Sequence, residues 1–278
     1  MRNVKIVADS SCDLFALKHA AFTSVPMSVV VDGKELLDEP SLNVDGMVNF
    51  LYQYKGKSRS SCPNTRAWLD AFDGADEVFC VTITSGLSGS YNSACAAKEI
   101  YEAENPGKRV HVFDTLSAGP EITLVIERIE ECVLQQLSFE EVCERVTAYM
   151  KRTGLVFMLK SLKNFANNGR ISPIVAKLVG IAGICIVGKA SEVGTLEPMH
   201  KCCGERRSID ALVGDLEAEG YRCGKISIGH CQNEAAALRI KEKILEKFEG
   251  AQVEIHRLRG LCSFYAEKGG ILVGFEKA

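Results

Sequence analysis

The fold is decided by the stretch Glu77-Val78-Phe79-Cys80-Val81-Thr82-Ile83-Thr84-Ser85-Gly86-Leu87-Ser88-Gly89-Ser90. Its first part, Glu77 to Thr82, is an apolar run typical of a buried strand, and a loop of serines and glycines then leads into a predicted helix from Tyr91 to Glu102. A strand that meets a helix through a polar loop is the repeating unit of a doubly wound parallel sheet. The glycines of the loop allow close backbone approach, and the helix N-terminus presents free N–H groups. The stretch therefore predicts an α/β fold and a place for a polar or anionic group.

The alternation of strand and helix continues on both sides of this stretch. Strands are predicted at Lys5–Ala8 and Arg109–Asp114, and two more over Val25–Leu37, where Asp32-Gly33 is a tight-turn signal. The predicted helices are Asn43–Tyr54, Thr65–Phe72, Glu121–Gln135 and Phe139–Arg152. We therefore expect residues 1–150 to form an N-terminal α/β domain with a parallel sheet.

The second half has a different pattern. Two long amphipathic helices, Ser208–Ala218 and Glu234–Phe248, are predicted among several strands. The predicted strands are Gly183–Lys189, Thr195–Lys201, Lys225–His230, Gln252–Arg257 and Gly270–Phe275. This spacing predicts a C-terminal α/β domain over residues 151–278, with a mixed or antiparallel sheet covered on one face.

Composition excludes several classes of protein. Of the 278 residues, 46% are hydrophobic and 25% charged, which argues against a disordered or collagen-like chain. The net charge of −3 gives no general reason to expect a nucleic-acid partner, but it divides into −9 for residues 1–150 and +6 for residues 151–278. Seven basic residues and no acidic one lie between Lys151 and Ser191. This basic segment is either a solvated face or a surface that meets an anion or an acidic partner.

The twelve cysteines are scattered along the chain, several within apolar runs, and none forms a Cys-x-x-Cys pair. We interpret them as mostly reduced, buried small side chains, and we expect no metal site. The N-terminus is predicted to be a strand and not a signal peptide, and the apolar stretch from Ile181 to Val187 is too short to cross a bilayer. The expectation is a cytoplasmic protein with no integral membrane segment.

Four hydroxyl-rich loops end predicted strands or precede predicted helices. They are Asp9-Ser10-Ser11, Ser58–Pro63, Thr84–Ser90 and Thr115-Leu116-Ser117. Ligands of open α/β sheets bind at the carboxyl ends of the strands, so together these loops would form a pocket for an anionic or strongly polar group. Helix capping is the alternative explanation for any one of them.

Signatures of catalysis are weak by comparison. The chain has no Gly-x-Gly-x-x-Gly, no Walker loop and no Gly-x-Ser-x-Gly elbow. A structural role is the default for its histidines. His230, at the end of a predicted strand, is the one that could hydrogen-bond a carboxylate. Arg170 lies in a predicted turn, where it is either a solvated side chain or a guanidinium that meets an anion at an interdomain cleft.

Several motifs resemble the DegV family of fatty-acid-binding proteins, which includes the lipid-binding subunits of bacterial fatty acid kinases. The resemblance covers essentially the whole chain. The motifs that carry it are Lys5–Leu14, Ser60-Ser61-Cys62-Pro63, Ser85–Ala94, Phe113–Gly119, and Leu159–Lys163 leading into Gly169-Arg170-Ile171-Ser172.

The resemblance implies a two-domain fold in which one long-chain fatty acid, palmitate-like, lies in an interdomain tunnel. By position, the expected carboxylate ligands are hydroxyls of Ser60 or Ser61 and of Ser85 or Ser88, with Gly86 in the same loop. Arg170 would lie near the cleft mouth, and His230 is kept as a candidate. Tyr265 falls nearest the place where family members often have a histidine that also contacts the carboxylate. Burying an acyl chain of about sixteen carbons, at about 0.8 kcal/mol per CH₂, would supply the affinity.

The leading hypothesis is a non-enzymatic carrier that needs no cofactor and presents its fatty acid to a separate ATP-dependent kinase subunit for acyl-phosphate formation. One alternative is a serine-dependent hydrolase or transferase with Ser85 or Ser88 as nucleophile, for which His230 is the candidate base. Another is a regulator whose conformation responds to bound lipid.

Overall fold

The protein is described by a computed structural model that places residues 3–171, 175 and 183–278. Ser172 of the Gly-Arg-Ile-Ser motif and Lys177 of the basic segment lie outside the described residues.

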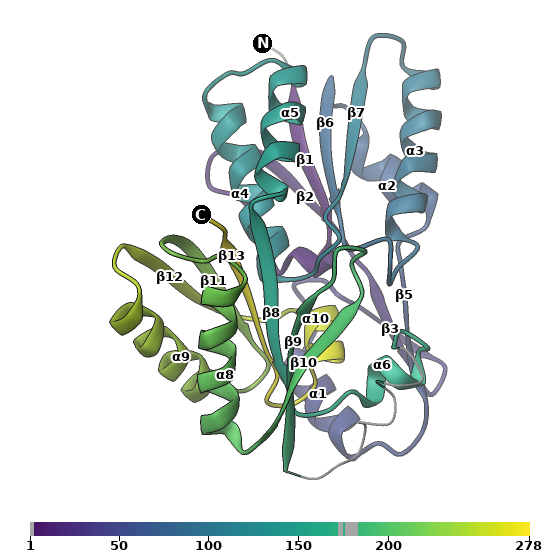
Figure 1. The fold of residues 1–278 in the computed structure, drawn as a ribbon. Coiled ribbons are helices and arrows are strands. Elements are labelled where there is room, and N and C mark those ends of the chain that lie inside the picture. The colour runs from purple at the N-terminus through teal and green to yellow at the C-terminus, as the bar shows by residue number, and fades with distance from the viewer. Residues whose placement is uncertain (1–2, 172–174, 176–182) are drawn as a thin grey trace.

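The N-terminal half is built on a four-stranded parallel sheet, sheet A, in the order β2-β1-β6-β7 (Figure 1). Its strands are β1 (Val4–Asp9), β2 (Ala21–Val25), β6 (Glu77–Thr82) and β7 (Arg109–Asp114). Helices α2 (Thr65–Phe72) and α3 (Ser90–Glu104) bury apolar side chains against one face. Helices α4 (Pro120–Leu134) and α5 (Phe139–Met150) do so on the other. The predicted doubly wound parallel sheet is confirmed.

The C-terminal half is built on a six-stranded sheet, sheet C, in the order β10-β9-β8-β13-β11-β12. Its strands are β8 (Thr153–Leu159), β9 (Ile184–Ala190), β10 (Leu196–Cys203), β11 (Gly224–His230), β12 (Ala251–Arg257) and β13 (Ile271–Glu276). Neighbouring strands are antiparallel except β11 and β12, which are parallel. The predicted mixed sheet is confirmed, although its central strand β8 was not predicted.

Both faces of sheet C are covered, so the expectation of a sheet covered on one face was wrong. Helices α8 (Glu205–Ala218) and α9 (Glu234–Lys247) bury one face. The other face packs against α1 (Val44–Gln53), α6 (Lys163–Asn167), α10 (Gly260–Ala266) and a small third sheet. The error arose because the elements that cover the second face come largely from the first half of the chain.

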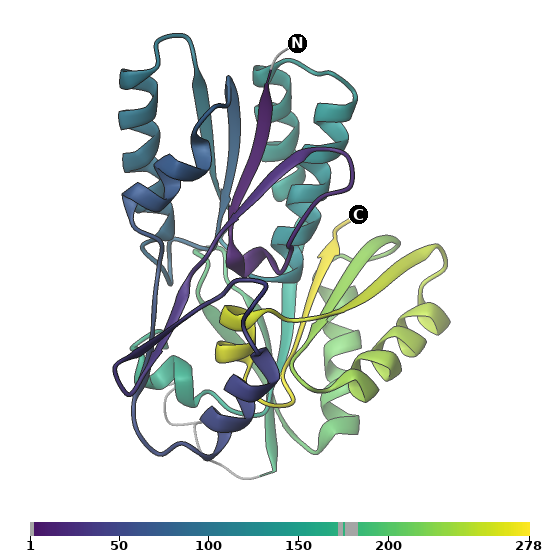
Figure 2. The same cartoon turned by 180° about the vertical axis from the view of Figure 1, so that it is seen from behind.

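The third sheet, sheet B, has the antiparallel order β4-β3-β5 (Figure 2). Its strands are β3 (Ser28–Val31), β4 (Lys34–Leu37) and β5 (Ser58–Ser61). The tight turn predicted at Asp32-Gly33 joins β3 to β4, and both residues have positive φ, as a type I′ turn requires. Val29 and Val31 pack in the same cluster as Leu155 and Phe157 of β8. The segment from β3 to β5 therefore packs on sheet C, and the division of domains at residue 150 stays a prediction.

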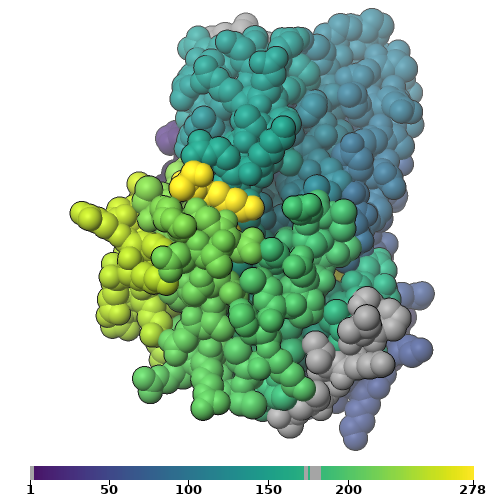
Figure 3. Space-filling view, viewed as in Figure 1, coloured from purple at the N-terminus to yellow at the C-terminus, as the bar shows by residue number. Residues whose placement is uncertain are grey.

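Helix α4 joins the two halves because it lies between sheet A and sheet C (Figure 1). The approach depends on Gly274 of β13, where a Cβ atom would stand 2.4 Å from the backbone N of Glu121. Thr153 of β8 donates a 2.7 Å hydrogen bond to the buried Glu121 carboxylate. The space-filling view shows the two halves in contact along this junction (Figure 3).

Among the described residues, no helix combines the length and the apolar character that crossing a bilayer requires. All twelve cysteines are described, and each is a free thiol in the structure. Six are buried, four are half-buried and two are exposed.

Candidate functional site

A cavity of about 110 Å³ lies where sheet C, sheet B and the loops at the carboxyl end of sheet A meet. Most of its wall is apolar, and β8, β13, α6 and α10 all contribute to it. The apolar side chains include Met27, Ile83, Leu87, Leu116, Leu155, Phe157, Leu159, Phe165, Leu196, Leu261 and Leu272. Such a lining favours a ligand with a hydrocarbon body.

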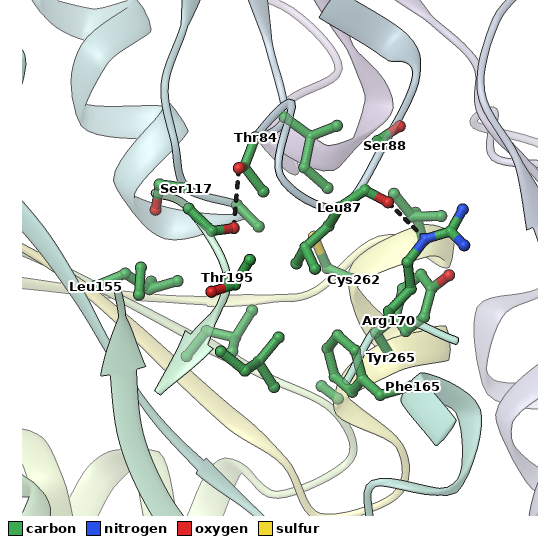
Figure 4. A pocket seen from close by; sticks show the side chains of 18 of the residues that line it. Thr84, Leu87, Ser88, Ser117, Leu155, Phe165, Arg170, Thr195, Cys262 and Tyr265 are labelled. Atoms are coloured by element: carbon green, nitrogen blue, oxygen red, sulfur yellow. Dashed lines mark hydrogen bonds between the residues drawn. The ribbon is translucent and has the colours of Figure 1, made fainter. Parts of the chain in front are cut away.

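One side of the cavity is polar. Figure 4 shows Ser88, Arg170 and Tyr265 grouped there, and Ser60 joins them because its Oγ is 2.7 Å from the Tyr265 hydroxyl. Burial raises the pKa of Tyr265, so its phenol stays protonated at neutral pH. Two hydroxyls in contact use only one O–H between them, so the pair keeps one proton to donate. The Ser88 Oγ accepts a hydrogen bond from the Ser90 N–H (3.2 Å), which leaves the Ser88 proton available.

Arg170 is held by backbone carbonyls. Its Nε donates to the Leu87 carbonyl (2.5 Å), and its Nη1 donates to the Asn168 carbonyl (2.7 Å). The side chain thus bridges the segment after α6 to the loop before α3, and it places a half-buried positive charge beside the polar side of the cavity. Two other cations of the basic segment are paired with acids: Lys160 with Glu205 (2.7 Å) and Lys189 with Glu219 (2.8 Å).

Three further hydroxyls, Thr84, Ser117 and Thr195, line the opposite side of the cavity (Figure 4). All three are used within the protein. Thr84 donates to the Gly194 carbonyl (2.9 Å), Ser117 donates to Glu121, and Thr195 shares a 2.9 Å hydrogen bond with Ser191. These residues consequently shape and close the cavity.

The turn between β9 and β10 covers this side of the cavity. Gly194 at its tip has a φ of 72°, and a Cβ there would stand 1.9 Å from the Thr84 Oγ1 and 3.0 Å from the Leu116 Cα. Only glycine allows this approach with this backbone conformation. Position 194 therefore fixes how closely the turn can sit on the loops of sheet A.

The first hydroxyl-rich loop, Asp9-Ser10-Ser11, holds the loop before α3 through hydrogen bonds to Asp9. The buried Asp9 carboxylate accepts hydrogen bonds from the Ile83 N–H (2.9 Å) and the Ser90 hydroxyl (2.6 Å), and also from Ser11. Burial raises the pKa of Asp9, and these hydrogen bonds oppose the rise. Asp9 and Ser11 thus hold the loop before α3 in place and do not line the cavity.

Helix α10, which carries Tyr265, is positioned by an acid far away in sequence. Asp38 accepts hydrogen bonds from the N–H groups of Gly260 and Leu261, both at 2.8 Å. The buried Arg259 donates to the Asp38 carbonyl (2.6 Å), and its own N–H donates to Asp13 (2.7 Å). Burial raises the pKa of Asp13 to about 8. This network sets where the Tyr265 hydroxyl lies.

A family model described as DegV matches residues 3–278. The chain belongs to the DegV family. A DegV domain-containing protein of Streptococcus pneumoniae is 43% identical over 98% of both chains.

Two solved structures of this family are especially similar. One is the fatty acid kinase (Fak) B3 protein of S. pneumoniae loaded with linoleic acid, with 42% identity, a TM-score of 0.96, and coverage of 99% of this chain and 100% of that one. The other is a DegV family protein from Eubacterium eligens loaded with heptadecanoic acid, with 40% identity, a TM-score of 0.96 and the same coverage. The DegV fold expected from the motifs is thereby shown.

Four of the residues singled out by the resemblance to the DegV family meet in the cavity: Ser60, Ser88, Arg170 and Tyr265. The structure places the others elsewhere. Ser61, Ser85 and Gly86 are exposed and do not line the cavity. His230 is buried in the wall of a second cavity at the other side of α10.

Sequence reasoning missed Thr195 and Cys262, which also line the cavity. Thr195 sits in a hairpin turn whose partner loop is more than a hundred residues away, and Cys262 lies in a helix that was not predicted. The hydroxyl-rich loops did signal Thr84 and Ser117. Among the described lining residues there is neither a histidine nor a carboxylate, so Ser60 and Ser88 have no general base beside them. No group of three potential metal ligands occurs among the described residues.

Proposed function

We propose that the protein binds a long-chain fatty acid in this cavity, with the carboxylate at Ser60, Ser88 and Tyr265. The observation that carries the proposal is an apolar cavity with uncharged hydroxyl donors gathered on one side. A carboxylate removed from water needs several hydrogen bonds, and hydroxyl groups supply them without the cost of burying a second charge. The fatty acids in the two similar DegV structures support this proposal.

The acyl chain would lie along the apolar wall formed by β8, β13 and α6. The cavity is smaller than the roughly 150 Å³ of an engineered cavity that holds benzene, so a long chain enters only when lining side chains move apart. Three leucines, Leu155, Leu159 and Leu272, make up most of that wall, and their flexible side chains change rotamer more easily than β-branched ones do. We therefore infer a site that adapts its volume to the ligand.

We further propose that the bound carboxylate is presented to a separate kinase subunit that uses ATP to form an acyl phosphate. Ser60, Ser88 and Arg170 are half-buried, so the polar side of the cavity is close to solvent and within reach of a partner. The similarity to the fatty acid kinase B3 protein supports this role. A cavity lining without a general base gives no comparable support to the serine hydrolase alternative.

The test is native mass spectrometry of the purified protein, followed by denaturation and identification of the released lipid. The expected result is one adduct per protein with the mass of a long-chain fatty acid. A protein that carries no adduct and takes up neither palmitate nor oleate would overturn the proposal. For the kinase role, the loaded protein is then mixed with ATP and a fatty acid kinase subunit, and acyl phosphate is trapped with hydroxylamine. Loaded protein that yields no hydroxamate refutes presentation but leaves binding intact.

A further inference from the structure

A second cavity, of about 300 Å³, lies at the carboxyl ends of the parallel strands β11 and β12. His230 ends β11 and Arg257 ends β12, and the two residues are directly paired in the sheet register. The remaining walls come from the N-terminal part of α1 and from the segment that joins β12 to α10, which lies beside α1 (Figure 2). Carboxyl ends of adjacent parallel strands joined through a helix are the usual ligand-binding edge of α/β structures.

The polar groups of this cavity are mainly donors. The Nη2 of Arg257 binds both oxygens of Asp45, at 2.5 Å, but its Nε and Nη1 have no partner among the described residues. His230 accepts the Asn233 N–H at Nδ1 (3.3 Å), so the neutral ring carries its proton on Nε2. Burial lowers the pKa of His230 and keeps the ring neutral at pH 7. The Asn43 Oδ1 caps α1 by accepting the Gly46 N–H (2.9 Å), which leaves its amide NH₂ group unused among the described residues.

The site is also held in a strained conformation. Gln232, between His230 and the start of α9, has φ of 51°, which non-glycine residues seldom adopt. Its side-chain amide donates to the Asp45 carboxylate (3.0 Å) and so orients Asp45 against Arg257. Strain of this kind persists where the surrounding structure fixes it and is concentrated at ligand sites. Leu42, Val48 and Leu258 add an apolar wall.

We propose that this second cavity binds a small organic anion, whose carboxylate or phosphate is held by Arg257, His230 and Asn43 and whose apolar part lies against Leu42, Val48 and Leu258. The free donors of Arg257 suit an anionic group with two oxygens, because guanidinium pairs with carboxylate and phosphate in this way. Asp45 neutralises one edge of Arg257 and leaves the other edge for the ligand. The site is separate from the proposed fatty-acid cavity: α10 lies between them, with Cys262 and Tyr265 on one side and Ser263 on the other.

The test is calorimetric titration of the intact protein in a phosphate-free buffer with inorganic phosphate, butyrate and butyramide, the last being the uncharged counterpart of butyrate. Saturable binding of phosphate or butyrate, and weaker binding of butyramide, is expected. Arg257→Gln should reduce anion affinity by about tenfold or more, since it removes charge-assisted hydrogen bonds. Because the Arg257–Asp45 pair is largely exposed, this change should leave stability nearly unaltered.

Asn43→Asp is a second variant, chosen to keep the fold. The aspartate keeps an oxygen that caps α1 but replaces the NH₂ donor with a negative charge, so anion affinity should fall again. Arg66→Gln is the matched control, because Arg66 is an exposed arginine on α2 paired with Asp70. Preferential binding of phosphate or of butyrate identifies which anion the site favours, and either supports the proposal. Absence of saturable binding, equal binding of butyramide, or unchanged affinity in Arg257→Gln would overturn it. Fatty-acid content of Arg257→Gln should match that of the parent, so this test fails or succeeds independently of the fatty-acid proposal.

Discussion

Replacing Tyr265 with phenylalanine removes a single hydroxyl from the polar side of the cavity. The ring should stay in place, because it packs against Phe165 and Phe264 with centroid separations of 4.6 and 4.9 Å. In the free protein the hydroxyl is bonded to Ser60 at 2.7 Å, and in the proposed complex the two hydroxyls turn to the carboxylate. The variant therefore isolates one donor to the head group.

The size of the effect follows from two opposing contributions. A hydrogen bond to a charged group contributes about 1.5–3 kcal/mol net, and the parent protein first breaks the Ser60–Tyr265 hydrogen bond, worth about 1 kcal/mol. The difference of about 0.5–2 kcal/mol corresponds to a loss of affinity of about 2- to 30-fold. Displacement of a fluorescent fatty acid by palmitate measures this loss.

A fatty alcohol of the same length provides the decisive comparison, because it lacks the carboxylate. Its affinity should change much less in Tyr265→Phe than that of the acid. Tyr52→Phe is the matched control, since Tyr52 is 70% exposed on α1. Equal losses for acid and alcohol would refute the reasoning, because they would show that the hydroxyl contacts the chain and not the head group. An unchanged affinity for the acid would place the carboxylate elsewhere.

Three other changes have specific expected outcomes. Gly194→Ala should lower the thermal midpoint and speed fatty-acid release in a stopped-flow dilution, because the added Cβ pushes the β9–β10 turn off the cavity. Gly33→Ala is the control: Gly33 has nearly the same positive φ, but a Cβ there would meet nothing within 4 Å, so the change should affect stability alone. The free energy of unfolding of the parent protein is expected to fall between about pH 4 and pH 8, and Asp13→Asn should make this fall smaller, as urea titrations at several pH values would measure. The carboxyl of Asp13, with its pKa raised to about 8, is protonated in the folded protein but ionised in the unfolded chain over that range, so stability is lost as pH rises. Ser88→Ala should weaken binding of palmitate by about tenfold, whereas Ser61→Ala should not change it.

A different result would contradict each of these three predictions. Equal release rates in the two glycine variants would show that the turn does not retain the ligand. An unchanged pH slope in the Asp13 variant would mean that this carboxyl is ionised in the folded protein at neutral pH. A larger loss at Ser61 than at Ser88 would move the head group to the exposed end of β5.

Local patterns predicted β1, β6, β7 and the helices around sheet A, because each of these segments carries its own apolar pattern, but they missed the edge strand β2. Strand β8 escaped prediction because Thr153–Leu159 is a short apolar run containing leucine and methionine, which periodicity cannot distinguish from buried helix. Helix α10 was not predicted because its N-terminus is capped by Asp38, more than two hundred residues away, and no local residue supplies a capping side chain. Such contacts are set by the tertiary fold.

The same reasoning applies to the candidate site. Motifs found Ser60, Ser88, Arg170 and Tyr265, but they could not separate lining serines from their neighbours, because that depends on which way each loop side chain turns. His230 went to the second cavity because the direction of β11 places its carboxyl end on the far side of α10. The position of His230 in the sequence did not reveal which of the two cavities it lines.

The place of β13 in sheet C has a consequence for the order in which the protein can be completed during synthesis. This strand, residues 271–276, follows β8 and β11 in the sequence but lies between them, inside the sheet. Until β13 has been synthesised, β8 and β11 lack the strand that pairs with both of them. The apolar side chains of β3 and α1, made some two hundred residues earlier, then lack part of the surface that covers them. Leu272, a wall of the cavity, belongs to the same strand. A nascent chain that stalls before residue 271 would therefore expose apolar surface that β13 otherwise covers, and its cavity would lack one wall.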